Sequence, residues 1–111
     1  MIKTTTELIA GREIAEVLGV VKGSTVRTKN VLRDLTAGLK NIVGGELKGY
    51  TEMLNEAREE SSDRMVAEAK SLGADAIIGI RYQSSSIANG GSEMLCYGTA
   101  VKLKYGNATR S

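Results

Sequence analysis

Apolar positions recur at helical spacing across residues 46–72 and predict one long amphipathic helix. Ser61 interrupts an apolar stripe that otherwise comprises Leu47, Tyr50, Leu54, Ala57, Met65, Ala69 and Leu72. Glu46 lies in the first turn and Lys70 in the last, where each charge suits the helix dipole. Gly73 follows, at the position where a left-handed residue commonly ends a helix. A helix with one apolar stripe needs a second layer to cover it.

Residues 13–28 are the first predicted strand, because they are rich in the β-branched residue valine. Gly11 and Gly23 punctuate this segment. Alternation places apolar residues on both faces of the strand, and such strands are usually covered on both sides. In a chain of this size, another subunit could supply the second cover.

Two further strands are predicted at residues 75–83 and 94–105. The connection between them, residues 84–92, contains a run of three serines and the dipeptide Asn89-Gly90, which is typical of a tight hairpin turn. Alternation gives the last strand two distinct faces. One face carries Leu95, Tyr97, Thr99, Val101, Leu103 and Tyr105, and the other carries Met94, Cys96, Gly98, Ala100, Lys102 and Lys104.

A short helix is predicted at residues 31–43, with Asn30 as its N-cap and a turn at Gly44-Gly45 before the long helix. The order is then strand, short helix, long helix and two-stranded hairpin. This order predicts a two-layer α+β subunit with helix packed on an antiparallel or mixed sheet. We expect one domain over residues 1–105 and a C-terminal tail at 106–111.

Composition narrows the classes of function. The chain has 111 residues, of which 41% are hydrophobic and 25% charged, and these values favour one globular domain. A net charge of +2 gives no argument for a nucleic-acid partner. Neither a signal-peptide stretch nor a transmembrane run is evident, so we expect a cytoplasmic protein with no membrane partner.

Catalytic chemistry finds little support in the residue types. Histidine is absent and there is one cysteine, so neither a Ser-His nor a Cys-His couple can form. The long helix carries the carboxylates Glu52, Glu56, Glu59, Glu60 and Asp63, which on an exposed face are normally solvated. Residues 44–51 approach a phosphate-binding loop pattern, but Tyr50 stands where that pattern needs lysine. We therefore expect a turn there and no enzyme activity.

An ordered series of short motifs runs along most of the chain. It comprises Thr4-Thr5-Thr6, Gly19-Val20-Val21, Arg33-Asp34, Gly38, Asn41-Ile42-Val43-Gly44-Gly45, Tyr50, Leu54, Ala57-Arg58, Glu68-Ala69, Leu72-Gly73-Ala74-Asp75-Ala76, Gly79 and Gly98-Thr99-Ala100-Val101. Across residues 2–103 this series resembles the YbjQ-like family of bacteria and archaea. The resemblance implies a dodecin-like α+β subunit, a ring-shaped homopentamer and a heavy-metal-binding label, and we expect a bacterial source.

The resemblance makes heavy-metal binding the first hypothesis to weigh. Met94 and Cys96 are the best donor pair, because soft metals prefer sulfur and the two residues share one strand face. One chain cannot complete a four-ligand sulfur site, although a ring could gather five copies of Cys96. The alternative is that Cys96 is a buried structural residue. Flavin binding, by analogy with dodecin, would need an aromatic platform, and the chain has four Tyr and no Trp.

The sequence therefore predicts a non-catalytic, cytoplasmic homopentamer that acts as a scaffold or binds a small ligand. The alternative function is heavy-metal binding at a subunit junction through Cys96 and Met94. We expect no cofactor, with a heavy-metal ion as the exception under that alternative.

Overall fold

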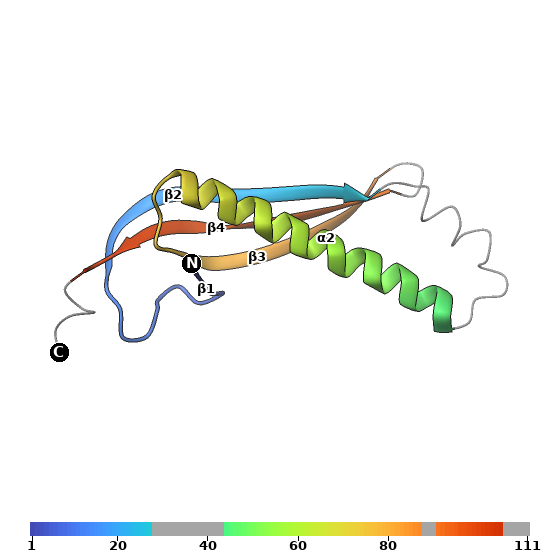
Figure 1. The fold of residues 1–111 in the computed structure, drawn as a ribbon, viewed down its shortest axis with the longest axis horizontal. Coiled ribbons are helices and arrows are strands. Elements are labelled where there is room, and N and C mark those ends of the chain that lie inside the picture. The colour runs from blue at the N-terminus through green and yellow to red at the C-terminus, as the bar shows by residue number, and fades with distance from the viewer. Residues whose placement is uncertain (28–43, 88–90, 106–111) are drawn as a thin grey trace.

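The computed structural model describes residues 1–27, 44–87 and 91–105, which form one long helix laid across a four-stranded sheet (Figure 1). The elements are β1 (Ile2–Lys3), β2 (Ile14–Arg27), α2 (Gly44–Ser71), β3 (Ala76–Ile87) and β4 (Gly91–Leu103). The predicted α+β class and helix-on-sheet layering are confirmed. The predicted short helix at 31–43, the Asn89-Gly90 turn and the 106–111 tail lie outside the described residues.

The strands lie in the order β1-β3-β4-β2, with β1 parallel to β3 and the other neighbours antiparallel. The sheet is therefore mixed, and the predicted hairpin of β3 and β4 forms its centre. Strand β1 was not predicted, because two residues are too few to show an alternation. The serine run at 84–86 was predicted as loop and lies in β3 instead, since it pairs with β4 as far as Ile87 opposite Gly91.

Helix α2 begins two residues earlier than predicted, because Gly44 and Gly45 open it rather than forming a turn. Its end agrees with the prediction to within one residue. Gly73 has a φ of +80°, and its amide donates a hydrogen bond to the Lys70 carbonyl at 3.0 Å. The Ala74 amide donates to the Ala69 carbonyl at 3.1 Å. The left-handed glycine thus ends α2 and turns the chain towards β3.

The core has two parts, one on each face of the sheet. On the α2 side, a buried cluster comprises Val21, Met65, Ala69, Ile77, Ile80, Cys96 and Ala100. On the opposite side, Ala76, Val101 and Leu103 are buried beneath Ile9, Ile14 and Ile78. The first cluster contains Cys96 and Ala100 of β4 and the second contains Val101 and Leu103, so the two predicted faces of β4 are confirmed. The N-terminal segment that carries Ile9 thus covers part of the face that α2 leaves open.

The packing stripe of α2 differs from the predicted one at Ser61, and also at Leu54, which is only half-buried whereas Met53 is buried. Ser61 is fully buried and belongs to a regular series of every fourth position: Met53, Ala57, Ser61, Met65 and Ala69. Its hydroxyl donates to the Arg58 carbonyl at 2.8 Å, which satisfies the polar group inside the core. Gly23 of β2 lies directly against the helix backbone here, so a small side chain at 61 permits the close approach. Leu72 lies beyond the helix and is 45% exposed.

Polar side chains of α2 cover the free edge of β2. The Lys22 amide donates to a carboxylate oxygen of Glu68 at 2.8 Å, and Arg64 donates to the Ser24 carbonyl at 2.6 Å. Glu60 links this group to the strand end, because it pairs with Arg64 at 2.8 Å and with Arg27 at 3.0 Å. These contacts occupy backbone groups that would otherwise accept an added strand.

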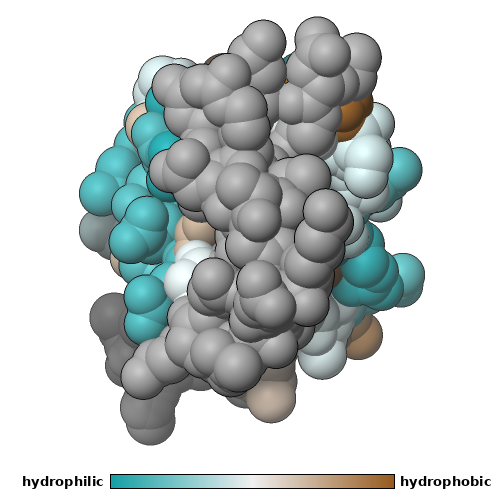
Figure 2. All heavy atoms as spheres, turned by 90° about the vertical axis from the view of Figure 1, so that its right-hand side faces the viewer, coloured by the Kyte–Doolittle hydropathy of each residue, from teal (hydrophilic) through white to brown (hydrophobic). Residues whose placement is uncertain are grey.

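In the part of the chain that the structure describes, no helix has the length and apolar character needed to cross a membrane. Seen end-on along its long axis, the residues that Figure 2 colours are mostly hydrophilic, with hydrophobic atoms in isolated spots.

Candidate functional site

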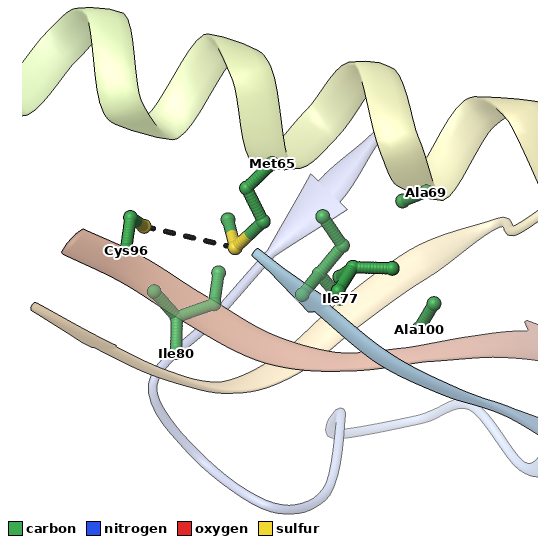
Figure 3. Close-up of a cluster of buried hydrophobic side chains, with 7 residues drawn as sticks. Met65, Ala69, Ile77, Ile80, Cys96 and Ala100 are labelled. Carbon is green, nitrogen blue, oxygen red and sulfur yellow. Dashed lines mark hydrogen bonds between the residues drawn. The ribbon is translucent and has the colours of Figure 1, made fainter. Parts of the chain in front are cut away.

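The single cysteine lies in the core between α2 and the sheet. Figure 3 shows Met65 descending from the helix towards Cys96 and Ile80, which rise from the strands below. Cys96 Sγ lies 3.6 Å from Met65 Sδ, and both residues are fully buried. The structure thus places a thiol and a thioether in direct contact.

Met94 and Cys96 occupy the same face of β4, as the alternation predicts, and Met94 is also buried. Both residues are buried within the single chain, so another subunit is not needed to bury them. The sulfur in contact with Cys96 belongs to Met65, which sequence reasoning did not single out as a ligand. The one available signal was its position on the apolar stripe of the helix, 31 residues away from Cys96.

Burial raises the pKa of the Cys96 thiol above its ordinary value, and the neighbouring Tyr82 side chain and Lys3 charge oppose that rise only in part. The thiol is therefore neutral at physiological pH. Since the thiolate is the reactive form and the side chain is enclosed, these properties are those of an unreactive core cysteine.

The donor set limits which metal could bind here. Within residues 1–27, 44–87 and 91–105, no three His, Cys, Asp or Glu side chains come together as a metal site. The arrangement does not fit zinc, which takes four ligands in structural sites. One thiol beside one thioether fits a soft ion of low coordination number, such as Cu(I).

A polar cavity of about 480 Å³ lies beside α2. Helix α2 supplies Asn55, Arg58, Glu59, Ser62 and Asp63 to its lining, and the strands supply Lys3 and Tyr82. Tyr82 joins the cavity to the core, since its hydroxyl lies close to the side chains of both Ser62 and Cys96. Partial burial raises the pKa of Tyr82, so it is a neutral hydrogen-bonding group at physiological pH.

The carboxylates predicted along the helix divide into distinct environments. Glu59 and Asp63 line the cavity, whereas Glu60 pairs with Arg27 and Arg64 on the β2 side. Glu52 and Glu56 are exposed. Residues 44–51, which approached a phosphate-loop pattern, form the first turns of α2. A loop that encircles a phosphate is therefore not present in that segment.

The chain is similar to known proteins over nearly its whole length. A family model described as "Putative heavy-metal-binding", YbjQ, matches residues 1–104. A UPF0145 protein of Vibrio campbellii is 61% identical over 103 residues, which cover 93% of this chain and 99% of the relative. A UPF0145 protein of Halorubrum lacusprofundi is 56% identical over 101 residues, covering 91% of this chain and 97% of the relative.

A solved structure also resembles this fold. It is the crystal structure of a DUF74 family protein from Pediococcus pentosaceus, with a TM-score of 0.65 and 19% sequence identity. The match covers 94% of this chain and 98% of the other. At this identity the likeness establishes the fold and nothing about the ligand.

Proposed function

The chain belongs to the YbjQ family, and we propose that it acts without catalysis as a cytoplasmic homopentamer that serves as a scaffold or binds a small ligand. The observation that carries self-association is an apolar row on the sheet face opposite α2. Val17, Val20 and Val26 of β2 are 62%, 73% and 50% exposed. The number of five subunits comes from the family resemblance.

The register of β2 places these valines on the sheet face opposite α2, where all three remain exposed among the described residues. Val21 is buried against α2, so Val20 points to the other side, and the same holds for Val26 beside the buried Thr25. Val17 lies opposite Val101, which belongs to the second cluster. An apolar face of a strand is normally covered, and a second copy of the chain is a natural cover.

The dimensions of the subunit also support assembly. Its radius of gyration is 18.2 Å, whereas a compact domain of this length has about 13 Å. A long, thin subunit exposes more surface than a compact one and gains more from association. Because α2 side chains occupy part of the free edge of β2, the proposed contact uses the face of the sheet rather than that edge.

Light scattering coupled to gel filtration tests the assembly directly. Five chains of 11.8 kDa amount to about 59 kDa, and we expect that mass at micromolar concentration. Val20→Glu should shift the mass towards that of one chain, because a buried interface would then contain an unpaired carboxylate. Ala67→Glu changes an exposed position on α2 and should leave the mass unchanged. A monomeric wild-type protein would refute the proposal.

A second candidate function is soft-metal binding, and the contact between Cys96 Sγ and Met65 Sδ favours it. We expect Ag(I), a probe for Cu(I), to bind at most one ion per chain and to raise the melting temperature through linkage. Cys96→Ala should abolish the shift, and Met65→Leu should weaken it while retaining most of the packing volume. Met94→Leu tests the other thioether. If the shift in melting temperature is lost in Met94→Leu but kept in Met65→Leu, Met94 rather than Met65 is the ligand.

The metal experiment also has a clear negative result. If calorimetry detects no Cys96-dependent binding of Ag(I) or zinc, the cysteine is a structural core residue. The homopentamer proposal does not depend on this result, because Val17, Val20 and Val26 lie on the sheet face opposite the one that carries Cys96.

A further inference from the structure

The cavity beside α2 brings together two cations and two anions from distant parts of the chain. Lys3 comes from β1, whereas Arg58 and Glu59 are adjacent in α2 and Asp63 lies about one turn further along the same helix. Among the residues that the structure describes, no ion pair within 4.0 Å joins any of these four groups to a partner. Both signs of charge therefore face the same space without neutralising each other at short range.

The polar groups nearby are partly fixed. Ser62 is 6% exposed, and its hydroxyl accepts a hydrogen bond from the Lys3 ammonium at 3.5 Å. Arg58 donates to the Asn55 side-chain oxygen at 2.6 Å, which holds the guanidinium at the cavity. The Tyr82 ring and hydroxyl complete the lining from β3. The site thus contains oriented donors as well as carboxylate acceptors.

This mixture disfavours a ligand with a single charge. A simple anion attracted by Lys3 and Arg58 would be repelled by Glu59 and Asp63. A simple cation attracted by the two carboxylates would be repelled by the two basic side chains. A ligand with one charge of each sign avoids both repulsions. A volume of about 480 Å³ is within the range of small-molecule sites.

We propose that this cavity binds a small zwitterion that carries both a carboxylate and an ammonium group, as a free amino acid or a dipeptide does. The carboxylate faces Lys3 and Arg58, and the ammonium faces Glu59 and Asp63. The proposal names the ligand class for the small-ligand part of the proposed function and rests on that part. Tyr82 offers a ring face to the ligand's side chain and a hydroxyl to its polar end.

Calorimetry on the native oligomer tests the charge requirement with matched probes. L-leucine and L-alanyl-L-alanine carry both charges, N-acetyl-L-leucine lacks the ammonium, and L-leucinamide lacks the carboxylate. We expect a zwitterion to bind in the millimolar range, because the charged groups are solvent-accessible. Loss of either charge should weaken binding by about tenfold, as expected for one charge-assisted contact. The better of the two zwitterions distinguishes an amino acid from a dipeptide.

Two double variants should exchange the preference of the site. Lys3→Gln with Arg58→Gln leaves the carboxylates, and this variant should prefer L-leucinamide to N-acetyl-L-leucine. Glu59→Gln with Asp63→Asn leaves the cations and should show the opposite order. Glu13→Gln with Lys104→Gln removes a separate ion pair of 3.4 Å and should leave binding unchanged. Thermal melts confirm that each variant is folded.

The outcomes separate this proposal from the one it rests on. Equal affinity for the zwitterions and the capped probes would overturn the zwitterion proposal. Absence of binding at about 10 mM would also overturn it, because a ligand held by one carboxylate contact and one ammonium contact should be detected at that concentration. Light scattering on the same samples reports assembly independently. A pentamer that binds no probe rejects the zwitterion site alone, whereas a monomer that binds L-leucine rejects the assembly alone.

Discussion

Gly23→Ala is expected to destabilise the fold by about 3 kcal/mol or more, or to prevent folding. A Cβ at this position would lie 2.2 Å from the Ser61 carbonyl oxygen and 2.5 Å from the Met65 amide nitrogen. Both are backbone atoms of α2, so a rotamer change cannot relieve the overlap. The helix would have to move away from β2.

Thermal denaturation measures this effect, and Gly49→Ala is the matched control. We expect Gly23→Ala to lower the melting temperature by roughly 10 °C or more. Gly49 lies within α2 with nothing within 4 Å of its Cβ position, so alanine there should stabilise the helix by about 0.5–1 kcal/mol. Similar melting temperatures for Gly23→Ala and wild type would show that the helix does not pack on β2 as described.

Met65→Ala is expected to cost about 2–5 kcal/mol, because it removes the largest fully buried side chain of the core and leaves a cavity. The cavity lies directly against Cys96, whose thiol should then react with maleimide faster than in the wild type. Met65→Leu approximately preserves the volume, so its cost should stay below about 1.5 kcal/mol and the thiol should remain protected.

Denaturant unfolding and alkylation rates together show whether Met65 acts by packing or through a specific role of its thioether. If Met65→Ala is strongly destabilised and its thiol becomes reactive, Met65 acts by packing. An equal loss of stability in Met65→Leu would contradict this account and would point to a specific role for the thioether. The alkylation should be followed near neutral pH, where burial keeps the Cys96 thiol protonated, since its pKa is raised.

Elements with a long repeating pattern could be predicted from the sequence. Helix α2 has an apolar residue at nearly every turn, and Gly73 supplies a stop signal, so both its type and its end were predictable. The two faces of β4 followed from strict alternation. The serine run 84–86 was misassigned, because serine is typical of loops and its strand conformation depends on pairing with β4.

Features that arise from contacts between distant segments left no readable signal. Met65 meets Cys96 only because α2 crosses the sheet at that point. Lys3 reaches the cavity through its place in β1, a two-residue strand that carries no pattern. Gly23 was interpreted as punctuation, although a glycine inside a strand also marks a site of close backbone approach.

The side chains that cover the edge of β2 have a consequence for how the protein behaves at high concentration. Strand β2 has 14 residues, and an edge strand of that length is a template for cross-β growth between molecules. Glu68 already occupies the Lys22 amide and Arg64 the Ser24 carbonyl, so an incoming strand would have to displace a carboxylate and a guanidinium. Contacts between sheet faces can close into a finite ring, whereas strand addition has no natural end. These two charged side chains therefore help the chain avoid seeding fibres.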